Sequence, residues 1–236
     1  MGNRQTLSFT WLGHATFLFR SPGNKLILID PWLETNPSTP DAAKKIRELD
    51  LLLLTHGHAD HTGDAIAVAR ATRARVVAPY ELSIWLERKG LQTVTGMNPG
   101  GTLSALGLSI TMVAAVHSSS IEEDGRTLYL GEATGYVIRF EDNLTIYFAG
   151  DTSVFGDMRL IGEMYSPAIA FLPIGDLYTM GPEQAAKACE LLSVKQVVPM
   201  HYGTWPTLTG TPAALRALVE PRGVQVLELK PGETAS

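Results

Sequence analysis

A run of four leucines, Leu51 to Leu54, leads directly into the segment Thr55-His56-Gly57-His58-Ala59-Asp60-His61. The leucines predict a buried strand. Three histidines and one aspartate then fall within six positions, and core packing gives no reason for such a cluster. Imidazole nitrogens and carboxylate oxygens are, however, ligands that divalent zinc, manganese and iron accept. The strand is therefore expected to end in a metal site.

The spacing within this segment divides the ligands between two positions. His56 and His58 alternate along the chain, so at a strand end both can point to the same side and hold one ion. Asp60 and His61 lie further along the turn, where they can reach a second ion beside the first. A polar loop with surface histidines is the alternative, but the chain has only 6 histidines and half of them are here.

Composition and charge argue against several other classes of protein. The net charge is −5, the pI is near 5.7, and no stretch concentrates Lys or Arg, so no nucleic-acid partner is expected. Cys189 is the only cysteine, which excludes a disulfide framework. Residues 1–20 show no signal-peptide pattern, and no apolar run approaches the roughly 18 residues of a membrane span. We therefore expect a cytoplasmic protein without a membrane span.

Strands and helices are predicted along the whole chain with no linker between them, which favours one α/β domain over residues 1–236. Residues 122–125 are predicted to be a polar turn, and residues 127–132 are not assigned. Helices are expected at 39–49, 62–71, 81–89, 158–164, 182–192 and 212–219. Strands are expected at 6–19, 25–29, 51–54, 75–78, 93–94, 101–105, 108–116, 136–140, 144–148, 168–172, 196–198 and 224–229.

Residues with metal-ligand chemistry recur where the predicted strands end: Asp30, the segment 56–61, His117, Asp151 and His201. In layered α/β proteins functional side chains gather at strand ends along one edge of a sheet, so these residues are expected to converge. His14 is the remaining histidine and lies among apolar neighbours. The ordinary explanation for His14 is a core histidine, and the ordinary explanation for Asp30 is a turn-forming residue before proline. We expect both to support the metal site rather than bind the ions.

These motifs resemble the metallo-β-lactamase superfamily over nearly the whole chain. The His-x-His-x-Asp-His pattern at residues 56–61 is highly specific. The flanking sequences look like the branch of uncharacterised metal-dependent hydrolases, which is akin to the ascorbate-6-phosphate lactonase group and, more distantly, to the N-acyl phosphatidylethanolamine phospholipase D group. The motifs that carry this resemblance are Gly13-His14-Ala15, Thr55-His56-Gly57-His58, Gly150-Asp151-Thr152, Pro173-Ile174-Gly175-Asp176, Tyr178-Thr179-Met180-Gly181-Pro182 and Pro199-Met200-His201-Tyr202-Gly203-Thr204.

The resemblance implies a four-layer αββα sandwich, in which two mixed β-sheets are flanked by helices and a dinuclear site lies at one edge. It assigns His56, His58 and His117 to the first metal. It assigns Asp60, His61 and His201 to the second metal, and it makes Asp151 the bridge. All seven positions carry the expected residue type. Asp30 takes a supporting role, in which a carboxylate fixes an imidazole through its other nitrogen.

Hydrolysis is the chemistry that such a site predicts. Two divalent ions lower the pKa of a bridging water, so hydroxide is available at neutral pH, and they polarise the group under attack. Asp60 can bind metal and orient that hydroxide. His14, Tyr178 and Tyr202 are the candidates for a proton donor to the leaving group, although packing explains each tyrosine equally well. We therefore expect cleavage of a small ester, lactone or phosphodiester.

Other functions are weaker alternatives. Nucleases of the superfamily carry an added arm or an inserted domain, and the roughly 50 residues between Asp151 and His201 leave no room for one. Di-iron oxidoreductases on this fold use more carboxylate ligands and pair with a flavin domain, and neither is present. A metal-binding protein without turnover is disfavoured by the complete ligand set. True β-lactamase activity is also disfavoured, because fold does not fix substrate and Asp60 and His201 match the general hydrolases.

The identity of the metal and the oligomeric state are less constrained. Two zinc ions suit a histidine-rich site with carboxylates, and manganese or iron tolerates the same ligands. Related proteins are commonly oligomeric, which favours a homo-oligomer acting on a small-molecule substrate. Trp32, Trp85 and Trp205 mark either an interface or a pocket rim, or they serve packing alone.

Overall fold

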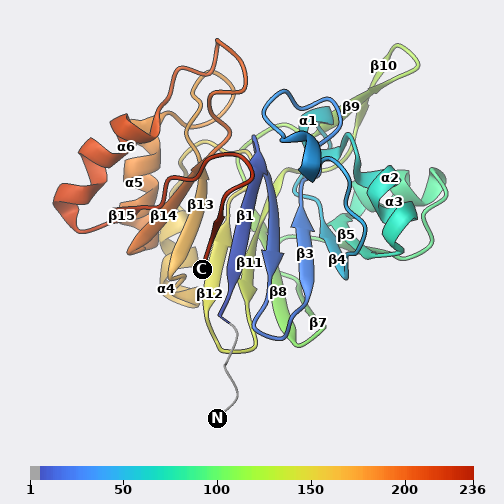
Figure 1. Cartoon of the computed structure of the whole chain (residues 1–236), viewed down its shortest axis with the longest axis horizontal. Helices are drawn as coiled ribbons and strands as arrows, with labels where there is room; N and C mark the ends of the chain where they lie inside the picture. Colours follow the sequence, from blue (N-terminus) through green and yellow to red (C-terminus); the bar gives the residue numbers. More distant parts are fainter. Residues whose placement is uncertain (1–5) are drawn as a thin grey trace.

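The computed structural model describes residues 6–236 and contains two seven-stranded sheets packed face to face (Figure 1). The strands of the first sheet are, in spatial order, β16 (Thr234–Ala235), β1 (Ser8–Gly13), β2 (Thr16–Arg20), β3 (Leu26–Ile29), β4 (Leu51–Leu53), β5 (Arg75–Pro79) and β6 (Val94–Met97). Those of the second are β15 (Gln225–Val226), β14 (Gln196–Met200), β13 (Ile169–Pro173), β12 (Thr145–Phe148), β11 (Thr134–Arg139), β8 (Leu108–Ala114) and β7 (Thr102–Ala105). Each sheet mixes antiparallel and parallel pairs.

Helices cover the outer face of each sheet (Figure 1). Helices α2 (Ala65–Thr72) and α3 (Tyr80–Arg88) pack on the first sheet, and α4 (Met158–Tyr165), α5 (Pro182–Leu192) and α6 (Pro212–Val219) pack on the second. Buried apolar clusters fill the space under each helical layer and the space between the sheets. The predicted αββα sandwich is therefore confirmed. Over residues 6–236, every helix is too short or too polar to cross a membrane.

The leucine run forms β4 at the centre of the first sheet, and the burial of both its faces explains its composition. Leu51 and Leu53 point into the core between the sheets, where the phenylalanine rings of both sheets also meet. Leu52 and Leu54 point the other way, into the core under α2 and α3. All four side chains are fully buried, as expected of a strand with parallel neighbours on both sides.

Several predicted elements differ from the structure. The predicted strand 6–19 is a hairpin, because Gly13 and His14 adopt φ values of +102° and +53° that turn the chain between β1 and β2. The predicted helix 39–49 is wrong except for a short 3-10 turn at Asp41–Ala43. Ala43, Ile46 and Leu49 pack against the core under α2 and α3, but capping signals alone do not stabilise a helix in so short a segment. The predicted helix 62–71 is divided into α1 (Ala59–Thr62) and α2.

Two further differences lie in the second half of the chain. Residues 120–129 form a separate hairpin of β9 (Ser120–Glu123) and β10 (Arg126–Tyr129). The sequence predicts only a turn at 122–125 and no strand in this region. The predicted strand 224–229 is reduced to β15, and a short 3-10 turn, Glu220–Arg222, precedes it. Strand β16 follows near the C-terminus and extends the other sheet by pairing with β1.

Buried hydroxyl groups tie the end of β4 to the opposite sheet. The Tyr136 hydroxyl on β11 donates to the carbonyl of Leu54 at 2.7 Å, and the Thr134 hydroxyl donates to the carbonyl of Thr55 at 2.9 Å. Both side chains are buried. The backbone just before His56 is therefore fixed from both sheets.

The two fully buried tyrosines of the second sheet offer a matched test. Tyr147 has no hydrogen-bond partner for its hydroxyl within residues 6–236, whereas Tyr136 has one. We expect Tyr136→Phe to lower the free energy of unfolding by about 1–2 kcal/mol, because it leaves the Leu54 carbonyl unpaired. Tyr147→Phe should leave that free energy unchanged or raise it by up to about 1 kcal/mol. Urea denaturation of both variants measures the difference, and equal losses would contradict this account.

Candidate metal centre

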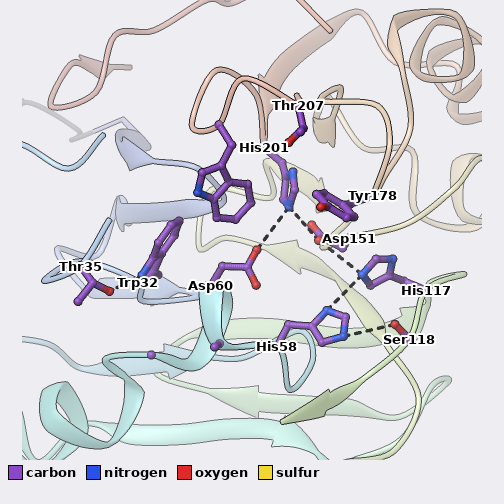
Figure 2. Close-up of a pocket in the computed structure, with 13 residues that line it drawn as sticks. Trp32, Thr35, His58, Asp60, His117, Ser118, Asp151, Tyr178, His201 and Thr207 are labelled. Carbon is purple, nitrogen blue, oxygen red and sulfur yellow. Dashed lines mark hydrogen bonds and ion pairs between the residues drawn. The ribbon is translucent and has the colours of Figure 1, made fainter. Parts of the chain in front are cut away.

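Side chains from six strand ends meet at one edge of the sandwich. Figure 2 shows His58, Asp60, His117, Asp151 and His201 close together there. His14 lies between β1 and β2, and Asp30 follows β3. The predicted ligands reach this edge from four further strand ends, one in the first sheet and three in the second. They are the β4–α1 segment (His56, His58, Asp60 and His61) and the ends of β8 (His117), β12 (Asp151) and β14 (His201). The convergence expected from the sequence is observed.

One group consists of three histidines. His56, His58 and His117 each offer one ring nitrogen, and these nitrogens lie within 4.8 Å of one another. The Nδ1 atom of His58 is 3.0 Å from His56 Nε2 and 3.3 Å from His117 Nε2. Burial, as the largest influence, lowers the pKa of all three imidazoles, so they are neutral at pH 7. Neutral imidazoles that aim at a common point are suitable ligands for one divalent cation.

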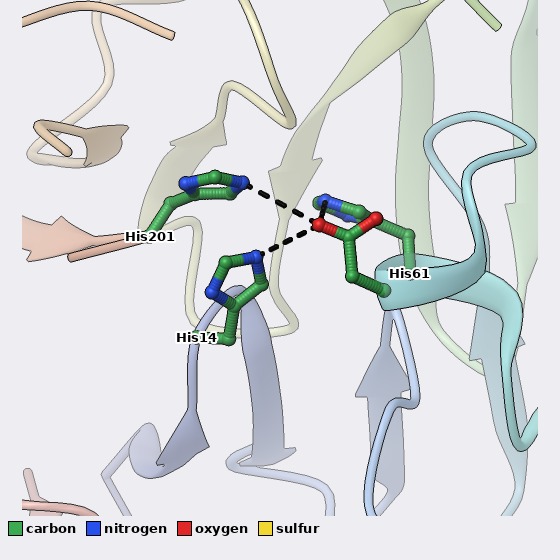
Figure 3. Close-up of side chains that lie close together, drawn as sticks. His14, His61 and His201 are labelled. Carbon is green, nitrogen blue, oxygen red and sulfur yellow. Dashed lines mark hydrogen bonds and ion pairs between the residues drawn. The ribbon is translucent and has the colours of Figure 1, made fainter. Parts of the chain in front are cut away.

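A second group surrounds the carboxylate of Asp60 (Figure 3). Its Oδ2 atom lies 3.0 Å from His14 Nε2, 3.7 Å from His201 Nε2 and 3.9 Å from His61 Nε2. Burial opposes ionisation of Asp60, but His61 and the hydrogen bonds from His14 and His201 outweigh it and lower the pKa of the carboxyl. Asp60 is therefore an ionised, acceptor-only group.

Asp151 contacts both groups. Its Oδ2 atom is 3.0 Å from His201 Nε2, 3.3 Å from His61 Nε2 and 3.6 Å from His117 Nε2 (Figure 2). Burial alone would raise the pKa of the Asp151 carboxyl, but the charges of His201 and His61 outweigh burial and lower that pKa. The structure thus places one ionised carboxylate between the histidine group and the Asp60 group.

The donor set fits divalent cations. The buried atoms His61 Nε2 and Asp151 Oδ1 make no hydrogen bond within residues 6–236, although buried polar atoms normally have a partner. Five imidazoles and two carboxylates also form the borderline-to-hard ligand set that zinc, manganese and iron accept. Without ions, the clustered carboxylates outweigh burial and raise the pKa of His61, and they raise that of His201 to about 9. The protons on His61 and His201 thus occupy the positions at which metal ions would bind.

Asp30 lies beneath the centre and fixes the orientation of two rings. Its carboxylate accepts hydrogen bonds from the Thr55 amide at 2.8 Å and the Thr55 hydroxyl at 2.6 Å. It also accepts from His61 Nδ1 at 2.8 Å, and Thr55 Oγ1 in turn is 3.0 Å from His56 Nδ1. With both Nδ1 atoms engaged, the Nε2 atoms of His56 and His61 are left to face the site. The oxygens of Asp30 are already used, which agrees with a supporting role.

His14 has both ring nitrogens engaged. Nε2 faces the ionised Asp60 at 3.0 Å, and Nδ1 is 2.9 Å from the Thr204 hydroxyl. Since Asp60 can only accept, Nε2 carries the proton and Nδ1 accepts from Thr204. Burial and the neighbouring His201 lower the pKa of His14 to about 4, so the ring is neutral. The contacts make His14 a donor that positions Asp60.

Three of these residues have left-handed backbone angles. His14, Asp30 and His201 have φ values of +53°, +50° and +55°. Such angles are uncommon for residues other than glycine and cost about 1–3 kcal/mol each where they are strained. They occur where a strand ends and the chain must turn sharply. The turn directs each side chain along the edge of the sandwich.

The centre opens into a cavity of about 640 Å³. Tyr178 lines this cavity and is largely exposed, whereas Tyr202 is not among the lining residues and stacks on Trp11 with ring centroids 5.1 Å apart. Tyr202 follows His201 in the chain, but its side chain packs against the buried apolar clusters and does not line the cavity. The lining residues are Trp32, Thr35, His58, Ala59, Asp60, Gly63, His117, Ser118, Asp151, Tyr178, His201, Trp205 and Thr207.

Some of the surroundings were not predicted from the sequence. Thr35, Thr204 and Thr207 were not singled out as functional residues, because an isolated threonine in a loop carries no distinctive signal. Trp32 and Trp205 were recognised only as packing or rim residues. Their ring centroids are 5.5 Å apart, and both lie beside His14, at 5.2 and 4.9 Å. A tryptophan a few residues from a ligand, as Trp205 is from His201, was the available clue.

Relatives with known structures share this architecture. A novel metallo hydrolase, Igni18, from the archaeon Ignicoccus hospitalis is 38% identical, with a TM-score of 0.86 over 98% of each chain. An isothiocyanate hydrolase from Delia radicum gut bacteria has a TM-score of 0.73 at 23% identity, over 97% of this chain and 98% of the other. The diiron β-hydroxylase CmlA from Streptomyces venezuelae has a TM-score of 0.75 at 18% identity, over 97% of this chain and 54% of the other. The last two show the fold alone.

Sequence relatives extend over the whole chain. UPF0173 metal-dependent hydrolases from Koribacter versatilis and Rubrobacter xylanophilus are 49% and 50% identical. The alignments cover 98% and 95% of this chain and 99% and 94% of the relatives. Residues 25–202 match the family described as the beta-lactamase superfamily domain. The expected relation to the lactonase and phospholipase D groups stays a prediction. The chain therefore belongs to the beta-lactamase superfamily and is a metal-dependent hydrolase of the metallo-β-lactamase fold.

Proposed function

We propose that this protein is a dinuclear hydrolase that cleaves a small ester, lactone or phosphodiester. The first ion would be held by His56, His58 and His117, and the second by Asp60, His61 and His201. Asp151 would contact both ions. The observation that carries this proposal is the position of Asp151 Oδ2, which lies 3.6 Å from His117 of one group and 3.0 Å from His201 of the other. Zinc is the ion we favour, because five of the seven ligands are imidazoles.

When bound, two such ions would supply an activated water at neutral pH and polarise the carbonyl or phosphoryl group. Side chains of the protein would orient the water and protonate the leaving group. Asp60 is 22% exposed and lies at the boundary between the buried ligands and the cavity, so its carboxylate can orient the attacking water. The His14 Nε2–H group holds that carboxylate in one orientation. Tyr178, which lines the cavity, is our remaining candidate for protonating the leaving group.

Two alternatives have weaker support. A nuclease would need basic side chains along its cavity, and none of the lining residues among 6–236 is Lys or Arg. A di-iron oxidation catalyst is suggested only by a fold relative at 18% identity. We also propose a homo-oligomer, on the basis of the resemblance to related proteins, and a cytoplasmic location, on the basis of the sequence pattern alone.

Initial rates on a generic phosphodiester and a simple lactone test the reaction class. Protein reloaded separately with zinc and with manganese should turn over at least one of the two substrates. Asp60→Asn should lower that rate by about 100-fold or more, because the neutral amide neither binds the ion as strongly nor orients the water. Equal rates in Asp60→Asn and the unaltered enzyme would contradict the assignment. No turnover of either substrate by protein with two bound ions would count against hydrolysis of these classes.

Metal uptake should release protons at pH 7. The raised pKa values keep His61 and His201 protonated in the metal-free protein, while the lowered values keep His56, His58 and His117 neutral. One ion should therefore bind with little dependence on pH between 6 and 8. The other must displace protons, so its affinity should rise with pH by roughly tenfold per unit for each proton displaced.

Calorimetric zinc titrations in two buffers of different ionisation enthalpy measure the number of protons released. Between one and two protons per protein are expected. Asp151→Ala removes the shared carboxylate and should bind fewer than two ions. Binding of both ions without proton release, or two tightly bound ions in Asp151→Ala, would overturn the dinuclear assignment.

His14 should act through Asp60 and not as a ligand. His14→Ala is expected to keep two bound ions and to lose about tenfold to 100-fold in kcat, the range seen when a support behind a ligand is removed. Thr204→Val should cause a smaller loss in kcat, because it removes only the hydroxyl at Nδ1. Thr209→Val alters an exposed threonine in the same region and serves as the control. Metal analysis that finds one ion in His14→Ala would show that His14 is a ligand.

A further inference from the structure

Two tryptophans form one side of the cavity. Trp32 and Trp205 have ring centroids 5.5 Å apart and planes inclined by 39°. Trp205 also lies against His14, at 4.9 Å, and His201, at 6.5 Å. In Figure 2, Trp32 lies on the far side of Asp60 from Tyr178 and His117. Its contact with Trp205 places the pair beside the Asp60 group. A molecule that reacts at the centre can therefore place neighbouring atoms against these indoles.

The position of Trp32 is fixed before any ligand arrives. Its indole Nε1–H donates to the Thr35 hydroxyl at 2.7 Å, and its backbone amide donates to the Thr16 hydroxyl at 3.2 Å. Its carbonyl accepts from the Asn36 side chain at 3.1 Å. The amides of the next two residues donate to the Asp64 carboxylate. A rigid aromatic surface binds a flat partner without the loss of side-chain entropy that a mobile one would suffer.

Outside the proposed metal ligands, the cavity wall that the structure describes offers no cationic side chain for an anionic substituent. Among residues 6–236, none of the side chains that line it is Lys or Arg. Its two carboxylates, Asp60 and Asp151, belong to the proposed ligand set. Apart from the proposed ligands, the polar side chains of the lining are hydroxyl groups, those of Thr35, Ser118, Tyr178 and Thr207. A phosphate or carboxylate held there would lose its hydration without gaining a charged partner.

We propose that Trp32 and Trp205 form the substrate-recognition surface for a flat, apolar and uncharged ring attached next to the bond that is cleaved. This inference rests on the proposed hydrolytic function, which it narrows. Ring stacking on Trp205, with Trp32 behind it, supplies the affinity, and the centre acts on the adjoining carbonyl or phosphoryl group. Sugar phosphates and nucleotides carry charge where the surface is apolar, so they are poor substrates.

Binding of unreactive amides tests recognition apart from turnover. The probes are propanamide, 3-phenylpropanamide and 3-phosphonopropanamide, titrated calorimetrically into zinc-reloaded enzyme. We expect the phenyl compound to bind at least tenfold more tightly than the other two. Trp205→Ala should reduce this preference by about threefold to tenfold, and Trp205→Phe should retain most of it. Trp85→Ala removes an indole on α3, outside the cavity, and should leave the preference unchanged.

The ethyl esters of the same three acids then test turnover. All three release ethanol, so a difference in their rates reflects recognition of the acid part and not the leaving group. The ratio of kcat/KM for the phenyl ester to that for ethyl propanoate should fall in Trp205→Ala and persist in Trp85→Ala. A preference for the phosphonate compound, or a phenyl preference that Trp205→Ala does not change, overturns the inference. If the amides bind selectively but no ester is hydrolysed, the recognition surface is supported and the proposed hydrolytic reaction is contradicted. If all three esters are hydrolysed at similar rates, the hydrolytic reaction is supported and the recognition surface is contradicted.

Discussion

The buried carboxylate of Asp30 is the interaction on which the metal-binding edge depends. It is fully buried at the end of β3, and it joins that strand to the segment after β4 through Thr55 and to α1 through His61. Its hydrogen bonds also decide which nitrogen each ring presents. Because His61 donates to it directly and His56 reaches it through the Thr55 hydroxyl, both rings offer Nε2 to the site. One acid thus orients a member of each metal-binding group.

Such an arrangement requires a rigid frame, because its ligands come from segments far apart in the chain. His14, Asp30 and His201 hold left-handed backbone angles that are unfavourable in isolation. The sandwich holds them: the His201 amide donates to the carbonyl of His14, which joins the two sheets at the site. The Tyr136 and Thr134 hydroxyls make a second connection, below His56. The stability of the core is therefore what keeps the ligands in position.

The sequence predicted the parts that depend on local pattern. The leucine run required burial on both faces, and the spacing of His56, His58, Asp60 and His61 has few purposes other than metal binding. The hairpin turn at His14 was missed, because its cause is a backbone conformation within a continuous run of strand-forming residues. The helix expected at residues 39–49 was inferred from its capping signals, but those signals do not supply the apolar contacts that stabilise a helix. Thr55 and Thr204 stand in recognisable motifs, but their roles depend on partners distant in sequence, Asp30 and His14, so the motifs alone do not reveal those roles.

The proposed metal ligands and the aromatic cavity wall come from different segments of the chain, which helps to explain how one fold can catalyse several reactions. Relatives of this fold include an isothiocyanate hydrolase and a diiron β-hydroxylase. Here the ligands sit on strand ends and α1, whereas Trp32 and Trp205 sit on loops, and the loop that carries Trp32 is held by its own hydrogen bonds. The loop that carries Trp32 makes its bonds to Thr16, Thr35 and Asp64, none of which is a proposed ligand. The ligands and the aromatic surface lie on different segments, so loop residues can change specificity while the ligands stay on the strand ends, provided that the contacts of the indoles with His14 and His201 are kept.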